Sequence, residues 1–218
     1  INKHELIKSF NINQNGINDL LKIDEKKFIS SSKDKTIKIF ELTEDYLNIN
    51  CLQSIEIHND EVNETIKLKS NNFYASCSND KTIKIWELKN DGIGVKKDLK
   101  GHETEIISIF ELPNNEIVSV SNGAFLKFWD YEQCLKTLEI YDIPLHKCIS
   151  LFKDNIISIG TNKSIIFIDF IKKEKKKKIL LDFNSTSMLN LFGNLIFGQK
   201  NDNDEEEPTL KEYYIFKS

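Results

Sequence analysis

Short runs of apolar and β-branched residues, separated by clusters of Asn, Asp, Gly and Ser, follow one another along almost the whole chain. Runs of this kind, bounded by turn-forming residues, predict short β-strands joined by tight turns. The clearest group predicts strands at residues 62–68, 73–76 and 82–88. A looser fourth strand is predicted after each group, at residues 51–57, 95–99, 134–140 and 178–183. The pattern therefore predicts an all-β protein.

One nine-residue phrase recurs within this pattern. The phrase SKDKTIKIF at residues 32–40 returns as SNDKTIKIW at 78–86 and, in weaker form, as SNGAFLKFW at 121–129. The copies start 46 and then 43 residues apart. Self-similarity at such a period predicts an array of small units that bury a core only by stacking on their neighbours.

The pattern divides the chain into five repeats of a single domain. The predicted boundaries are 13–57, 58–100, 101–140, 141–183 and 184–218. The fifth repeat is degenerate, with two strands predicted in 189–199 and an insertion at 200–211. A spare strand at residues 6–12 is predicted to complete the last sheet and close the array, which removes a free sheet edge.

The second repeat contains a set of four residues at characteristic spacings, namely His58, Ser76, Asp80 and Trp86. This set resembles the structural tetrad of the WD40 family of β-propellers. The resemblance implies a buried chain of hydrogen bonds in which Asp accepts from His, His is linked to Ser, and Ser accepts from the Trp indole. A catalytic Ser–His–Asp triad is not favoured, because an enzyme needs one triad rather than several decaying copies.

The other repeats contain parts of the same set. They are Ser30, Asp34 and Phe40 in the first repeat, His102, Ser119 and Trp129 in the third, and Ser158 and Asn162 in the fourth. Gly123 stands where the third repeat should have Asp. The resemblance implies a WD40-type β-propeller of about five four-stranded blades. Since the family usually has seven blades, this is either a small ring or part of a larger one.

WD40 propellers typically bind partners across one end of the ring, and the resemblance implies eight positions on that surface. They are Asn18, Asn63, Ile107 and His146 in the first strands, and Lys33, Asn79, Asn122 and Thr161 before the turn Asp or its substitute. For Ile107 two interpretations are open. It is either an exposed apolar anchor for a partner or a buried residue of the strand core.

The resemblance implies a non-catalytic platform for protein partners, a scaffold or adaptor within a larger complex. Two alternatives are a substrate-recognition domain of a multidomain enzyme, such as a kinase or ubiquitin ligase, and a subunit of a coat, ribosome-assembly or cytoskeletal complex. The chain begins with Ile1 rather than Met, so we expect it to be a piece of a longer protein. No Gly-rich phosphate-binding motif occurs, and neither a cofactor nor a small-molecule substrate is predicted.

Charge narrows the class of partner. The net charge of −4 and the pI of about 5.7 argue against a general nucleic-acid binder, and no apolar stretch is long enough for a membrane helix. A lysine run at residues 172–178 and an acidic run at 202–207 are interpreted as solvated loops. The alternative is that the lysines dock an acidic partner, an anionic membrane or RNA.

The cysteines and histidines indicate no metal site. The four cysteines lack CxxC spacing and are predicted to be free thiols of a reducing compartment. His4, His102 and His146 are too scattered to form a zinc site. A cytoplasmic location is expected, with the nucleus as an alternative.

Overall fold

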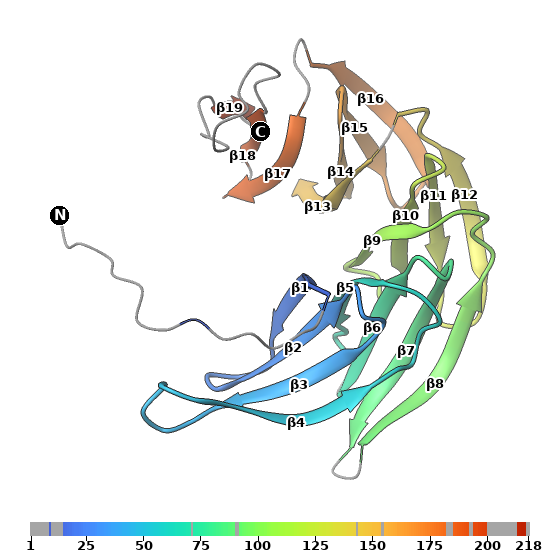
Figure 1. Cartoon of the computed structure of the whole chain (residues 1–218). Coiled ribbons are helices and arrows are strands. Elements are labelled where there is room, and N and C mark those ends of the chain that lie inside the picture. Colours follow the sequence, from blue (N-terminus) through green and yellow to red (C-terminus); the bar gives the residue numbers. More distant parts are fainter. Residues whose placement is uncertain are drawn as a thin grey trace, which may run out of the picture. The chain divides into compact units, whose positions relative to one another are not determined.

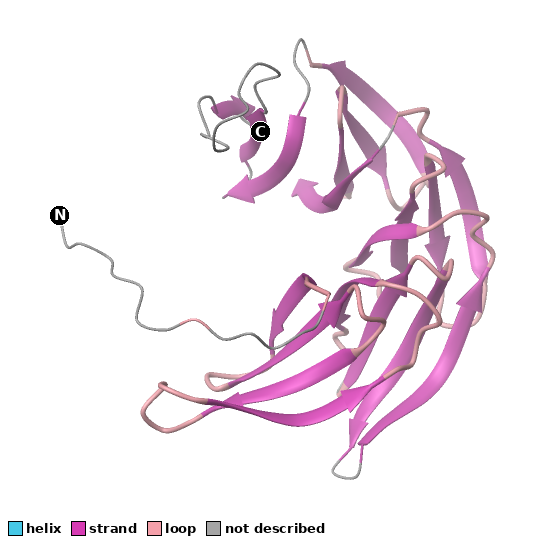
Figure 2. Ribbon diagram, in the orientation of Figure 1, coloured by secondary structure: helices cyan, strands magenta, loops and turns pink. Residues whose placement is uncertain are grey.

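The computed structural model describes residue 9 and residues 15–70, 72–89, 92–142, 144–153, 155–181, 185–191, 194–199 and 213–216. Within these ranges every regular element is a strand, as Figure 2 shows, which confirms the all-β prediction. No helix in this part of the chain is long and apolar enough to cross a membrane. The predicted closing strand at 6–12, apart from Ser9, and the acidic run at 202–207 lie outside the described residues.

The strands form sheets of consecutive antiparallel neighbours, labelled in Figure 1. Sheet 1 contains β1 (Ile17–Lys22), β2 (Lys27–Ser32), β3 (Ile37–Leu42) and β4 (Ile49–Ile55). Sheet 2 contains β5 (Val62–Lys67), β6 (Phe73–Ser78), β7 (Thr82–Lys89) and β8 (Gly92–Lys100). Sheet 3 contains β9 (Ile106–Glu111), β10 (Ile117–Ser121), β11 (Phe125–Trp129) and β12 (Cys134–Glu139).

Sheets 4 and 5 follow the same order along the chain. Sheet 4 contains β13 (Pro144–Lys153), β14 (Ile156–Thr161), β15 (Ser164–Asp169) and β16 (Glu174–Leu180). Sheet 5 contains β17 (Ser185–Leu191), β18 (Asn194–Gln199) and β19 (Tyr213–Phe216). The chain divides into two compact units, residues 1–98 (unit 1) and 99–218 (unit 2).

The predicted strand positions agree with the structure except at one place. The lysine run was predicted to be a loop followed by a strand at 178–183, but β16 begins at Glu174 and includes four of the lysines. The prediction was wrong because every residue of β16 except Ile179 is exposed, so no apolar periodicity marked the strand. Backbone pairing with β15, rather than burial, holds these lysines in the sheet.

Each unit has its own apolar core. In unit 1 the core joins sheets 1 and 2, and the Trp86 ring stacks on Tyr74 with 4.7 Å between ring centroids. In unit 2 it joins sheets 3 and 4, with Phe128 and Phe170 among its buried side chains. Full burial of one such side chain contributes about 1.5–3 kcal/mol relative to exposure. Each of these cores is thus built from the apolar faces of two neighbouring sheets.

A β-bulge recurs in the fourth strand of three sheets. The extra residue is Leu52 in β4, Leu135 in β12 and Lys176 in β16. Each lies beside the residue at the predicted tryptophan position, and each is exposed. We call this feature the fourth-strand bulge. Because the bulge falls at the same place in β4, β12 and β16, the residues of these three strands can be matched one to one.

Candidate functional site: the first-strand bulges and their turns

A second bulge recurs in the first strand of three sheets, where the extra residue is Asn18, Asn63 or Ile107. These are three of the four first-strand positions predicted for partner binding. The fourth, His146, lies in a stretch of β13 where the register also shifts, and its side chain is outside the described part. A bulge re-aims side chains and is common beside binding sites, so it gives this set of positions a physical basis.

The turn between the second and third strands is tied to the segment that precedes the first strand. Its main-chain N–H donors are Lys33, Asn79 and Asn122, which bond to the carbonyls of Gly16, Glu61 and Glu105 at 3.2, 3.0 and 2.8 Å. In these three sheets the turn and the first-strand bulge therefore lie at the same end. Lys33 and Asn122 are exposed there, and Asn79 is half-buried.

The turns themselves share one backbone conformation. Lys35, Lys81 and Ala124 occupy the same place in three turns and have φ angles of 71°, 68° and 60°. In two of them a serine hydroxyl fixes the turn, since Ser32 Oγ and Ser78 Oγ each accept from the main chain two residues later. The recurring phrase of the sequence thus encodes a rigid turn rather than a flexible loop.

In unit 1 these features bring three asparagines into a row. Asn63 Nδ2 donates to Asn79 Oδ1 at 2.8 Å, and Asn18 Nδ2 lies 3.0 Å from the Val62 carbonyl and 3.5 Å from Asn63 Oδ1. Asn18 Oδ1 and Asn79 Nδ2 have no partner among the described residues. This amide row leaves one acceptor and one donor, the pair that a peptide group can satisfy.

Three of the predicted positions are buried, and Asn63, at 5% exposed, acts through its hydrogen bond to Asn79 rather than by direct contact. Ile107 is 8% exposed and belongs to the unit 2 core, so it is a core residue and not an exposed anchor. The bulge turns it inward because apolar neighbours from sheets 3 and 4 surround it. Thr161 is fully buried, and its hydroxyl lies 2.9 Å from Ser164 Oγ.

The tetrad of sheet 2 forms a continuous chain. Trp86 Nε1 donates to Ser76 Oγ at 3.2 Å, Ser76 Oγ lies 2.8 Å from His58 Nε2, and His58 Nδ1 lies 2.8 Å from Asp80 Oδ2. Ser76 and Trp86 are fully buried, and His58 is 3% exposed. With the indole as donor, the consistent direction is from Trp86 through Ser76 and His58 to Asp80.

Asp80 also fixes the backbone at this end of sheet 2. It accepts from the main chain of Asn59 and of Thr82, both at 3.0 Å, and from the Thr82 hydroxyl at 2.7 Å. Burial acts to raise the pKa of Asp80, but the hydrogen bonds from His58, Thr82 and Asn59 outweigh it and hold the pKa well below its usual value. The carboxylate is thus a structural acceptor.

In sheet 1 the chain is incomplete. Asp34 accepts from the main chain and hydroxyl of Thr36 and pairs with Lys38 at 3.2 Å. Burial opposes ionisation, yet the hydrogen bonds from Thr36 hold the pKa of Asp34 well below its usual value. Ser30 is fully buried, and Phe40, at the tryptophan position, stacks on Phe28 at 5.3 Å.

In sheet 3 the carboxylate is missing. His102 Nε2 lies 2.6 Å from Ser119 Oγ, which accepts from Trp129 Nε1 at 2.7 Å, but the buried His102 Nδ1 has no partner. Thr104 fills the place of the acid, since a Cβ at Gly123 would lie 2.7 Å from its Oγ1. Burial, with a smaller effect of Lys127, lowers the pKa of His102 to about 3.

Sheet 4 replaces the tetrad by a network that the sequence did not reveal. Ser158 is fully buried and Asn162 is half-buried. Asp142 Oδ2 accepts from Ser164 Oγ at 2.5 Å and pairs with Lys178 Nζ at 2.8 Å. The sequence analysis did not single out Asp142.

The arrangement suits recognition. Among the described residues no group of three or more His, Cys, Asp or Glu side chains lies close enough to hold a metal ion. The sheet 2 tetrad side chains are buried and bonded to one another, while the candidate surface offers the half-buried amides of Asn18 and Asn79 and the exposed Asn122 and Lys33. Such groups bind by hydrogen bonds and charge.

Comparison with known proteins agrees with this architecture. The family model described as WD domain, G-beta repeat matches residues 4–41 and 49–87. A solved structure titled "Crystal structure of WD40 beta propeller domain of Doa1" is similar, with a TM-score of 0.66 and 24% sequence identity. The similarity covers 81% of this chain and 58% of that one, so the chain spans little more than half of it. The search of curated proteins finds no match.

Proposed function

This chain contains repeats of the WD40 family and has a WD40 β-propeller fold, and on that premise we propose that it is a non-catalytic platform that binds protein partners. Propellers of this family generally serve as protein-interaction platforms. Because fold alone does not fix function, the proposal rests on the surface at the first-strand bulges.

The observation that supports the proposal is the repeated tie between turn and first strand. In three sheets the same main-chain hydrogen bond fixes the turn that presents Lys33, Asn79 or Asn122. The conformational entropy of these turns is lost on folding, so a partner does not have to order them when it binds. Binding loops positioned by a rigid scaffold are a common arrangement in recognition proteins.

In unit 1 the surface offers specific chemistry. The amide row presents a free acceptor on Asn18 and a free donor on Asn79 to the main chain of a peptide, as judged within the described residues. The exposed Lys33 adds a positive charge in the turn whose main chain is bonded to Gly16, two residues before Asn18. We propose that a polar peptide segment with an acidic side chain binds here.

The test is affinity purification from the source cell with matched baits. Lys33→Glu reverses the charge at the candidate surface, and Lys22→Glu makes the same change at the other end of β1, where the lysine is also exposed. Partners lost with Lys33→Glu and retained with Lys22→Glu support the proposal. Partners retained by both variants, and by Asn122→Lys in unit 2, would place recognition elsewhere on the molecule.

The role of the platform within a larger assembly is a separate question. A substrate-recognition domain of a multidomain enzyme predicts a catalytic domain in the flanking sequence of the parent protein. A coat, ribosome-assembly or cytoskeletal subunit predicts migration at several times its own mass in gel filtration of a cell extract. We propose the adaptor role, and these two observations separate it from the alternatives.

We also propose an intracellular, cytoplasmic location. It is supported by Cys51, Cys77 and Cys134, none of which forms a disulfide among the described residues. Free thiols persist in reducing compartments, whereas secreted domains tend to form disulfides. Microscopy of the tagged parent protein tests the location, and a signal outside the cell would contradict it.

A further inference from the structure

Strand β16 carries the most concentrated charge in the described part of the chain. Four consecutive lysines, Lys175 to Lys178, lie in it, and all four are exposed. β16 is the last strand of sheet 4 (Figure 1) and pairs with β15 on one side. Its other side pairs with no strand that the structure describes, so it presents main-chain donors and acceptors along an edge.

The fold does not demand these lysines. At the fourth-strand bulge, β16 has Lys175, Lys176 and Lys177. The matching residues are Cys51, Leu52 and Gln53 in β4, and Cys134, Leu135 and Lys136 in β12. The same bulge thus forms with three uncharged residues in sheet 1 and two in sheet 3. The lysine concentration is a property of sheet 4 and needs its own explanation.

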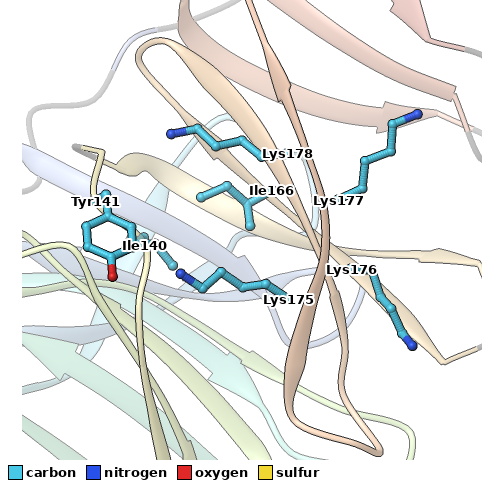
Figure 3. Close-up of a pocket in the computed structure, with 7 residues that line it drawn as sticks. All are labelled: Ile140, Tyr141, Ile166, Lys175, Lys176, Lys177 and Lys178. Carbon is cyan, nitrogen blue, oxygen red and sulfur yellow. The ribbon is translucent and has the colours of Figure 1, made fainter.

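The bulge also decides where the lysines point. Because it breaks the usual alternation along the strand, Lys175 and Lys178 extend toward Tyr141, while Lys176 and Lys177 extend to the opposite side, as Figure 3 shows. Lys175 Nζ lies 4.4 Å from the centroid of the Tyr141 ring, and this ring is 68% exposed. Positive charge therefore flanks β16 on both sides.

A small pocket opens beside this strand. It has a volume of 170 Å³ and is lined by Ile140, Tyr141, Ile166 and the four lysines (Figure 3). Ile140 and Ile166 are each 1% exposed, so they give the pocket an apolar base. Pockets with an apolar base and charged walls can hold one side chain of an extended segment and fix its register.

The lysines differ in how far their charge is already compensated. Lys178 pairs with Asp142 at 2.8 Å, and Lys176 with Glu174 at 2.9 Å. Lys177 has no partner within the described ranges, and Lys175 contacts only the Tyr141 ring. Two positive charges at this edge are therefore available to an anionic partner.

We propose that β16 is a docking edge for an acidic, extended segment of a partner protein, which adds to sheet 4 as a further strand. The proposal rests on the platform function but places a second contact away from the first-strand bulges. Carboxylates of the segment face Lys177 on one side of the sheet, and its apolar side chains face the other side, where one enters the pocket beside Lys175. Lysines on an edge strand discourage pairing with other sheets, and an acidic strand is the kind that they attract.

The main-chain edge favours a peptide over other anions. Strand addition satisfies the free donors and acceptors of β16, which RNA and lipid headgroups cannot do in register. Single-stranded RNA also needs several aromatic platforms, and Tyr141 is the only aromatic residue among those that line this pocket. The net charge of −4 also argues against RNA as the partner.

The experiment measures fluorescence anisotropy of a labelled octapeptide of alternating Glu and Val at low salt. Lys177→Glu should weaken binding about fivefold, since exposed ion pairs are individually weak and reversal replaces attraction by repulsion. Lys136→Glu, at the matching register of β12, should leave it unchanged. A peptide with Gln for Glu, and one methylated on alternate main-chain nitrogens, should each bind more weakly. Unchanged melting temperatures show that both variants fold.

Several outcomes overturn the proposal. The docking edge is disproved if Lys177→Glu and Lys136→Glu weaken octapeptide binding equally. It is also disproved if the octapeptide does not bind, or if the methylated peptide binds as tightly as the unmethylated one. Preferential binding of polyuridine or of phosphatidylserine vesicles, lost with Lys177→Glu, assigns the lysines to nucleic acid or membrane instead. Lys33→Glu should not alter octapeptide binding. If Lys33→Glu loses a cellular partner while the octapeptide results fail, the platform function stands and only the β16 proposal falls.

Discussion

His58 and His102 occupy the same place in sheets 2 and 3, but only His58 has a carboxylate partner. His58 Nδ1 lies 2.8 Å from Asp80, whereas His102 Nδ1 is buried without a partner. An unpaired buried polar atom costs about 1–3 kcal/mol. The two histidines therefore contribute very differently to stability, although the sequence gives both the same local pattern.

Asp80 and Asp34 form a matched pair for testing the tetrad. Asp80→Ala should lower the free energy of unfolding by about 2–3 kcal/mol, because it leaves the buried His58 Nδ1 with only the Thr82 hydroxyl 3.3 Å away and removes the acceptor of the Asn59 and Thr82 main chain. Asp34→Ala should cost about 1 kcal/mol, since the bonds to Thr36 and to the partly exposed Lys38 involve side chains that water can reach. Urea unfolding at neutral pH measures both, and equal losses would contradict a special role for the complete tetrad.

His102 predicts a pH dependence of stability. Its pKa in the folded chain is about 3, against 6.5 for an ordinary histidine, so between these values only the unfolded chain binds the proton. The free energy of unfolding is therefore unaffected by protonation of His102 above pH 6.5. As the pH drops from 6.5 toward 3, protonation of the unfolded chain lowers this free energy by about 1.4 kcal/mol per pH unit. Urea unfolding at pH 5 and pH 7 measures this loss. His102→Gln should show a smaller loss, and an identical loss would show that other groups cause it.

At the scale of elements, sheets 1 and 2 are joined in unit 1 by buried polar contacts as well as by apolar packing. Ser31 Oγ lies 2.7 Å from Thr65 Oγ1, and the Thr65 main chain donates to Asp19 Oδ2 at 3.2 Å. Ser31, Thr65 and Asp19 are all buried. Hydrogen bonds of this kind fix which face of one sheet meets the next.

Thr65→Val tests this junction. The change keeps the shape of the side chain but leaves the buried Ser31 hydroxyl without this partner, so unfolding should become easier by about 1–2 kcal/mol. Amide exchange should speed up first in β1 and β5. Thr137→Val removes an exposed hydroxyl from β12 and should leave stability unchanged. A similar loss in both variants would indicate a propensity effect rather than a lost contact between sheets.

The sequence predicted the strands with a strong apolar pattern and missed features that depend on register. The repeated phrase located the turns and the tetrad positions, because turn and core residues are constrained locally. The inward direction of Ile107 depends on a bulge and on sheet 4, which no local pattern encodes. The Asp142 network joins β14–β16 by tertiary contacts, and the exposed β16 has no apolar period to detect.

At the scale of the whole molecule, burial of the thiols reports on global opening. Cys51 and Cys134 are exposed, and Cys77 is fully buried in sheet 2. A thiol inside a core strand reacts only when the surrounding structure opens, at a rate set by the stability of that region. In a single reaction with a thiol reagent, Cys51 and Cys134 therefore report on surface reactivity, and Cys77 reports on opening of the structure.

In a Cys148→Ser background, two thiols should react rapidly with Ellman's reagent, and the third should react slowly. The slow thiol is Cys77, because none of its surface is accessible. Urea should accelerate this phase in parallel with the unfolding transition. Rapid reaction of all three thiols without urea would contradict the burial of β6, and Cys77→Ala identifies the slow phase directly.

The fourth-strand bulge has a consequence for how such a chain can diverge. Leu52, Leu135 and Lys176 occupy the same position in three sheets, and each faces solvent at a bulge that recurs from sheet to sheet. A substitution at this position changes the charge or polarity of the outer edge of one sheet without disturbing the core or the turns. New specificities can therefore accumulate one sheet at a time, while the repeats that build the scaffold stay under separate selection.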